Sequence, residues 1–235
     1  AKRIIVLWTS RLYSLQLPLT FDSEYFEIKN NQKILIATSV GWLHSNFLVD
    51  FSIGLFLRNK GWNVEFVLCR GSMQMCQAME SHRIPTYFQT NKFFKKIICF
   101  SCSYSISKLL NKFDFPVYEI QNVTIERADD ISKDLKQGLE REALAGYFRN
   151  IGKQAEVDTI IYPKYHDAAA AVFYFAESII KEISPHWIIC HHSIYVPQGP
   201  IKMAAKDGGV KLLNWDFSER KDTIYVTLGE STHEF

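Results

Sequence analysis

The stretch that decides the fold is residues 33–69, KILIATSVGWLHSNFLVDFSIGLFLRNKGWNVEFVLC. Residues 33–38 form a short apolar run rich in Ile, which is typical of a strand buried on both faces. An amphipathic segment follows, and residues 63–68 form a second apolar run. Because strand, helix and strand succeed one another, this stretch predicts a βαβ unit, the building block of a parallel sheet.

Glycine and short polar residues mark the turns of this unit. Gly41 permits a sharp turn after the first strand, and Ser45 or Asn46 is placed to cap the helix. Gly61 lies where a glycine commonly ends a helix. In an open parallel sheet, ligands bind beyond the carboxyl ends of the strands, so the loop 40–46 is the first candidate for a binding site.

A second unit of the same kind is predicted further along the chain. Residues 186–190, HWIIC, are typical of a buried strand. Pro200 suits the first turn of a helix, and the glycine pair 208–209 ends that helix. Residues 210–215 form the next predicted strand, and residues 223–228 form a further one.

The rest of the chain alternates helices and strands. By apolar periodicity we expect strands at 3–8 and 116–120 and helices at 72–81, 103–111, 129–148 and 165–183. Residues 1–32 are expected to form an irregular segment packed on the domain. Residues 33–235 are expected to form one Rossmann-like α/β domain, a three-layer sandwich with a mostly parallel central sheet.

Composition narrows the class of protein. The 235 residues are 47% hydrophobic, which is enough for a sizeable core, and 27 basic against 25 acidic residues leave a net charge of +2. So small a net charge creates no overall positive potential that would attract nucleic acid. No apolar run reaches the roughly 18–20 residues of a membrane span, and the N-terminus lacks a signal-peptide pattern. An odd number of cysteines favours a reducing compartment, so we expect a soluble, cytoplasmic protein.

One segment is both basic and aromatic, residues 86–96, TYFQTNKFFKK. Such a mixture can stack on the bases of nucleic acid. Since no fold-wide basic patch accompanies it, we expect Phe88, Phe93 and Phe94 to pack in the core or in a groove instead.

Histidines are the candidates for acid–base chemistry, because their pKa lies near neutral pH. His44 follows a glycine turn at a predicted helix N-terminus, and His191 and His192 follow a predicted strand. The adjacent pair is not a metal-ligand pattern, because neighbouring strand residues point to opposite faces, so one of the two is expected to face the binding edge. A structural hydrogen-bonding role is the alternative for each. No glycine-rich nucleotide motif is present.

Cysteines form the second group of candidate site residues. Cys99 and Cys102 make a C-x-x-C pair, and Cys69 and Cys76 are more widely spaced. Four thiolates would suit a tetrahedral zinc ion. Buried free thiols and a redox dithiol are the alternatives, and Cys190 is expected to be a small core residue.

Four segments together carry a family resemblance. They are ATSVGWLHSN (37–46), LRNKGWNVEFVLC (57–69), CHHSIYVPQGPIKMAAKDGGVKLLNWD (190–216) and YVTLGESTH (225–233). In order and spacing they resemble the N-terminal lobe of bacterial GT-B glycosyltransferases of surface-polysaccharide biosynthesis. The resemblance implies a single, acceptor-binding lobe of a GT-B fold, with the sugar-nucleotide lobe expected beyond Phe235.

The resemblance also implies a mechanism. The enzyme would transfer a sugar from a nucleotide-sugar donor to a glycan acceptor. His44, beside Gly41, would be the catalytic base if the reaction inverts the anomeric centre. A set of substrate-binding residues is implied too: Gly41, His191, His192, Tyr195 and His233.

The implied cofactors and partners follow from the same resemblance. This lobe would need no cofactor beyond a structural zinc at the cysteines, and the nucleotide sugar would bind the other lobe. Its partners would be the glycan and the donor, with a peripheral place at the inner membrane face. Two other functions remain open: a sugar-nucleotide epimerase-like lobe, and a non-catalytic binding or scaffold module.

Overall fold

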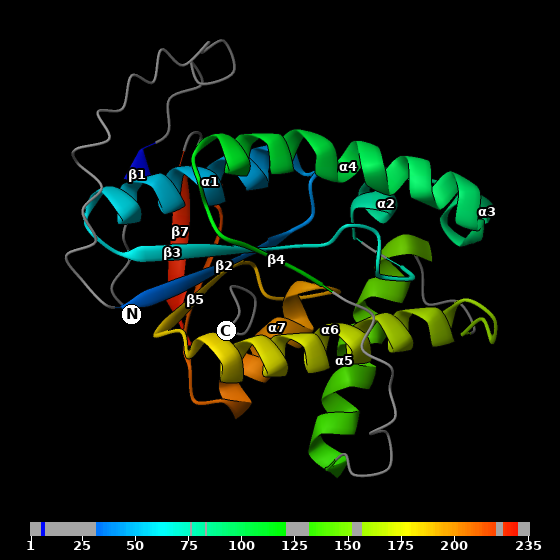
Figure 1. Ribbon diagram of the computed structural model, residues 1–235. Coiled ribbons are helices and arrows are strands. Elements are labelled where there is room, and N and C mark those ends of the chain that lie inside the picture. The colour runs from blue at the N-terminus through cyan, green and yellow to red at the C-terminus, as the bar shows by residue number, and fades with distance from the viewer. Residues whose placement is uncertain are drawn as a thin grey trace.

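The computed structural model describes residues 6–7, 32–75, 77–82, 84–120, 132–151, 157–219 and 223–229. A central sheet lies between two layers of helices (Figure 1). The predicted α/β, three-layer architecture is therefore confirmed. The predicted segment 1–32 falls outside the described residues except at its short strand and at its last residue.

Seven strands make up the sheet, in the order β1-β7-β6-β5-β2-β3-β4. Their bounds are β1 Val6–Leu7, β2 Lys33–Ser39, β3 Asn63–Leu68, β4 Val117–Glu119, β5 Trp187–His191, β6 Lys211–Phe217 and β7 Thr223–Leu228. The five strands β6, β5, β2, β3 and β4 run parallel to one another, β7 pairs antiparallel with β6, and β1 pairs antiparallel with β7. The sheet is thus mostly parallel, as the two βαβ patterns predicted.

Helices cover both faces of this sheet. Their bounds are α1 His44–Asn59, α2 Gln77–Ser81, α3 Thr86–Thr90, α4 Lys92–Lys112, α5 Lys133–Ile151, α6 Tyr162–Ile183 and α7 Gln198–Asp207. Figure 1 shows α1 and α4 on one side of the sheet and α5, α6 and α7 on the other. Within the described ranges, no helix is long and apolar enough to cross a membrane.

Each face has its own hydrophobic core. On the α6 side, an alanine-rich run with Val172 and Phe173 packs against Leu35 and Ile188. On the α1 side, Phe47 and Phe51 pack with Phe66 and Ile36. Because strands β2, β3 and β5 contribute to both cores, their near-continuous apolar runs are explained.

Gly41 differs from its predicted role. Its φ angle is not in the left-handed region, and the residue instead lies against α4, where an added Cβ would stand 1.8 Å from the carbonyl oxygen of Cys102. The predicted cap of α1 is also wrong. That helix begins at His44, and its N-cap residue Leu43 makes no side-chain capping bond. Close backbone packing, not turn chemistry, therefore explains the glycine.

Helix α4 is longer than the sequence predicted. We expected a helix over 103–111, whereas α4 begins at Lys92, where the Asn91 side chain accepts hydrogen bonds from the N–H groups of Phe93 and Phe94 at 3.0 and 3.3 Å. The predicted packing of Phe93 in the core or in a groove is wrong as well, since its side chain is 67% exposed. The first turns of α4 expose their apolar residues to solvent. A search for the apolar periodicity of a core-facing helix therefore does not detect these turns.

We expect Gly41→Ala to lower the free energy of unfolding by about 2–3 kcal/mol, because the new methyl group displaces the α4 backbone. The matched control is Gly209→Ala, where space is open and only a left-handed φ of +65° opposes the side chain. The control should cost about 1 kcal/mol. Urea unfolding of both variants measures the difference, and equal losses would contradict the packing explanation.

Candidate functional site

The site lies where the strand order reverses direction along the sheet. Strand β2 pairs in parallel with β3 on one side and with β5 on the other. The loops after β2 and β5 therefore meet at the carboxyl edge, the place where open α/β sheets bind ligands. The first turn of α1 touches the end of β5 at this edge: the Asn46 amide nitrogen lies 2.8 Å from Nδ1 of His191.

His191 is held between two side chains. Its Nε2 lies 3.3 Å from Oδ1 of Asp216, at the end of β6, and the ring is nearly buried. The Asn46 amide nitrogen lies within hydrogen-bond distance of both ring nitrogens, at 2.8 and 3.0 Å. The tautomer that serves both neighbours donates from Nε2 to Asp216 and accepts at Nδ1 from Asn46. Nδ1 is then the nitrogen with a lone pair for proton transfer.

Asp216 is tuned by this contact. Burial alone would raise the pKa of Asp216, but the hydrogen bond and the charge of His191 oppose burial, with help from the backbone N–H of Phe217 and the charge of His192. The pKa of Asp216 consequently lies below its ordinary value. The carboxylate therefore stays ionised at neutral pH and orients the imidazole, as an acid–base dyad requires.

Backbone strain brings the second histidine to the same place. His192, Ser193 and Tyr195 all have left-handed φ angles, of 37°, 51° and 65°. The turn at His192 breaks the strand alternation, so the rings of His191 and His192 lie side by side with centroids 4.0 Å apart. Our expectation that they point to opposite faces is wrong for this reason. Clustered strain of non-glycine residues is common at functional sites.

A hydrogen-bonded layer beneath the site keeps it in place. Trp215 packs against the ring of His191, with centroids 4.6 Å apart, and its indole N–H donates to Oδ1 of Asp50 at 2.6 Å. The hydroxyl of Ser193 donates to the side chain of Asn214. Since Trp215, Ser193 and Asn214 are fully buried, these groups support the site and do not meet a ligand.

The loop that follows is fixed from the helical layer. The buried side chains of Lys202 and Glu142 form an ion pair at 3.5 Å between α7 and α5. The Glu142 carboxylate lies so close to Gly199 that an added Cβ would stand 2.3 Å from it. At the surface, the guanidinium of Arg149 lies 4.5 Å from the ring centre of Tyr195. The helix that follows the loop is therefore fixed to α5 in the interior, and the loop itself contacts α5 at the surface through Tyr195.

The other predicted site residues are placed less centrally. His44 begins α1 on the same edge of the sheet, and its side chain is exposed. No hydrogen bond or ion pair joins it to another described residue. His233 lies outside the described residues. The structure thus brings His191, His192 and Tyr195 together beside Asn46, whereas Gly41 packs against α4 and His44 is exposed at the start of α1.

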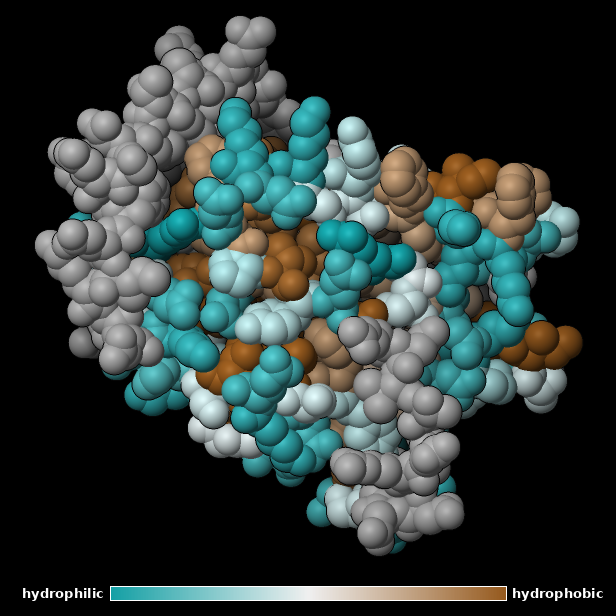
Figure 2. Space-filling model, viewed as in Figure 1, coloured by the Kyte–Doolittle hydropathy of each residue, from teal (hydrophilic) through white to brown (hydrophobic). Residues whose placement is uncertain are grey.

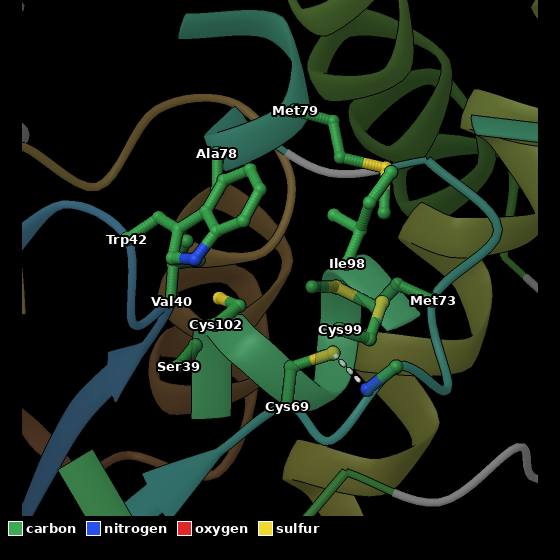
Figure 3. Close-up of a pocket in the computed structure, with 11 residues that line it drawn as sticks. Ser39, Val40, Trp42, Cys69, Met73, Ala78, Met79, Ile98, Cys99 and Cys102 are labelled. Atoms are coloured by element: carbon green, nitrogen blue, oxygen red, sulfur yellow. Dashed lines mark hydrogen bonds between the residues drawn. The ribbon is translucent and has the colours of Figure 1, made fainter. Parts of the chain in front are cut away.

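Three of the predicted zinc ligands surround one small pocket, while Cys76 lies outside the described residues. Figure 3 shows Cys69, Cys99 and Cys102 around this space, which measures about 20 Å³. The N–H of Gly71 donates to the sulfur of Cys69 at 3.3 Å. The three thiols are free, and among the described residues no group of three or more His, Cys, Asp or Glu side chains is arranged to hold a metal.

The chemistry of these thiols agrees with the free state. Burial raises the pKa of the Cys99 thiol to about 12, and the neighbouring Cys69 adds to this rise. Burial also raises the pKa of Cys102. Zinc binds thiolates, so a zinc ion at this pocket would have to displace the protons of these thiols. Cys190 is fully buried in β5, as expected of a core residue.

Sequence reasoning missed the partners of His191. Asn46 was considered only as a helix cap, and Asp216 and Asp50 were not singled out. A signal was present for Asp216, since it lies near the carboxyl end of β6, the strand next to β5, at the same edge of the sheet. The contact with Asn46 spans 145 residues of sequence, and the predicted meeting of the two loops was its only indication.

Comparison with known proteins gives few matches. No family model matches the chain, and no curated protein matches it. Among solved structures, the chain is similar to the zinc-inhibited form of teicoplanin deacetylase Orf2, at 12% identity and a TM-score of 0.37. The match covers 79% of this chain and 67% of that chain. At such a TM-score we transfer no activity or ligand from that enzyme.

These findings correct the family prediction. No comparison gives a glycosyltransferase, and the similar structure is a deacetylase, so the GT-B resemblance and the transferase function are wrong. The epimerase-like lobe and the scaffold module find no match either. The four segments that suggested the family consist largely of apolar strands, glycine turns and helix starts, which any parallel βαβ unit contains.

We expect His191→Asn to raise the pKa of Asp216, because the hydrogen bond and charge that oppose burial are lost. Because the pKa of Asp216 is lower in the folded wild-type protein than in the unfolded chain, where it is about 3.9, the ionised carboxylate stabilises the fold above about pH 3.9. This stabilisation is lost as the pH falls through the lowered pKa of the folded state. The variant should lose less stability on acidification. Carboxyl NMR titration measures the pKa, and an unchanged value would contradict the dyad.

We expect Cys99 to react with iodoacetamide at least about a hundredfold more slowly in the native protein than after unfolding, since a thiol with a raised pKa holds little thiolate. Mass spectrometry of the labelled peptides measures the two rates. Metal analysis of the same sample provides the control: about one zinc ion per chain would contradict the assignment of free thiols.

Proposed function

We propose that this chain is a hydrolytic domain in which His191 activates a water molecule for attack on a small polar substrate. The observation that carries the proposal is the position of His191, whose Nε2 is oriented by Asp216 at the carboxyl edge of the parallel strands β2, β5 and β6. An imidazole oriented by a carboxylate is the usual arrangement of a general base.

Water is the favoured nucleophile because the protein's own nucleophiles near His191 are unsuited. The Ser193 hydroxyl is fully buried and donates to Asn214. Burial raises the pKa of the Cys190 thiol to about 12, so it remains protonated. A water molecule that takes the place of the Asn46 amide would give its proton to Nδ1 while its oxygen attacks a polarised carbonyl carbon. The proton then passes to the leaving group.

Further polar groups for the substrate lie beside His191, where His192 is buried, and at the surface, where Arg149 is exposed. His192 and Tyr195 contact each other, with ring centroids 5.5 Å apart, and Arg149 covers the tyrosine ring from the exposed side. His44 remains a second candidate for substrate contact, because it is exposed on the same edge. Their chemistry suits a substrate rich in hydroxyl or carboxylate groups, which these donors can orient.

The test compares two histidines at opposite ends of β5. His191→Asn should lower the rate of p-nitrophenyl acetate hydrolysis by about a hundredfold or more, because general-base assistance is lost. His186→Asn is the matched control, since His186 precedes the opposite end of β5, where its Nδ1 accepts from the N–H of Lys33 at 3.3 Å. The control should keep the wild-type rate. A wild-type rate equal to buffer, or equal loss in both variants, would overturn the proposal.

A further inference from the structure

The exposed apolar side chains of this protein gather on two helices. Figure 2 shows apolar side chains projecting from the edge of the molecule formed by α3 and α4. These large hydrophobic residues are between 36% and 67% exposed: Tyr87, Phe93, Phe94, Ile97, Phe100 and Tyr104. Soluble monomers seldom expose a contiguous patch of this kind without a partner. We call these six residues the aromatic face.

Along α4 the aromatic face follows the helical repeat. Phe93, Ile97, Phe100 and Tyr104 are spaced four, three and four residues apart, so they form one stripe about 16 Å long. The same helix buries a different side, where Ile106 and Leu110 enter the core. Helix α4 therefore carries two apolar stripes, and only the second one is used in folding.

Lysines flank the outward stripe. On the helical wheel, Lys92 and Lys96 lie on one side of it and Lys108 lies on the other. From residue 86 to residue 112 the chain has five lysines and no acidic residue. In the part of the chain that the structure describes, no ion pair includes Lys92, Lys95 or Lys96.

A basic groove runs beside the aromatic face. It measures about 470 Å³, and Arg70, Lys92, Lys95 and Lys96 contribute to its lining together with Tyr104. Arg70 forms an ion pair with Glu119, in which Nε lies 2.9 Å from Oε1. This pair is exposed, so solvent screens it. The three lysines also lie at the N-terminal end of α4, where the helix dipole disfavours cations. An anion bound in the groove would offset both the mutual repulsion of the lysines and their unfavourable interaction with the helix dipole.

We propose that α3 and α4 dock on the surface of a bilayer that contains anionic lipids. An apolar stripe flanked by lysines is the pattern of a helix that lies in the membrane interface. Aromatic rings suit the headgroup level, and lysine stems reach outward to the phosphates. The groove then receives lipid phosphate while the aromatic face enters the acyl boundary. This docking does not depend on the proposed hydrolytic function.

Other occupants fit less well. A second copy of this chain would place its own lysines against these and so add repulsion. A nucleic acid would satisfy the lysines but would leave the apolar stripe of Phe93 and Ile97 in water. An anionic bilayer satisfies both the charge and the apolar area.

Vesicle co-sedimentation tests the proposal. The wild-type protein should bind vesicles of phosphatidylglycerol and phosphatidylcholine more tightly than vesicles of phosphatidylcholine alone, and salt should weaken this preference. Phe93→Ser combined with Phe100→Ser should lower binding at least tenfold. Lys92→Gln and Lys96→Gln should each lower the preference for anionic vesicles about fivefold.

Two control variants make the result specific. Ile160→Ser removes an apolar side chain that is 73% exposed elsewhere, and it should leave vesicle binding unchanged. His191→Asn should also leave it unchanged, which separates this proposal from the hydrolytic one. The proposal is overturned if the wild type fails to sediment with anionic vesicles or if the phenylalanine variants bind equally well. Tighter binding to a single-stranded oligonucleotide, or dimerisation that the phenylalanine variants abolish, would overturn it too.

Discussion

The parallel pairing of β2 with both β3 and β5 is the constraint on which the rest of this structure depends. Helices α1 and α4 cover one face of this sheet, and α5, α6 and α7 cover the other, as Figure 1 shows. The parallel pairing forces the loops after β2 and β5 to share one edge. The contact between Asn46 and His191 exists only because of this order. Sheet topology thus creates the site, and side chains supply its chemistry.

The buried parts of the fold could be predicted well from the sequence. Strands β2, β3, β5 and β6 are apolar runs that both faces of the sheet cover, so their residues carry a strong local signal. Helix α6 was predicted closely for the same reason, since one side of it is almost entirely apolar. Helix α4 was predicted poorly, because its first turns bury little and present Phe93 and Ile97 to solvent. Apolar residues on the exposed side of a helix do not follow the periodicity of the residues that face the core.

The candidate site could be predicted only in part. The carboxyl edge and the histidines His191 and His192 follow from general rules of parallel sheets. Their conformation does not, because a left-handed φ at His192 is decided by the loop and its supports, among them Glu142 and Asn214. The partners of His191 come from distant segments, and no local pattern reports such pairs. The family resemblance misled for a related reason: its motifs describe the scaffold of a βαβ unit and carry little that is specific to one reaction.

The short outer strand β4 has a consequence for colloidal behaviour. It has three residues, Val117–Glu119, and it lies at the border of the sheet. Unpaired backbone groups at such a border invite strands from other molecules. Here Pro116, which has no N–H group, precedes the strand, and the charged pair of Glu119 with Arg70 ends it. A foreign strand finds little length to pair with, which protects a sheet of mostly apolar strands from forming aggregates.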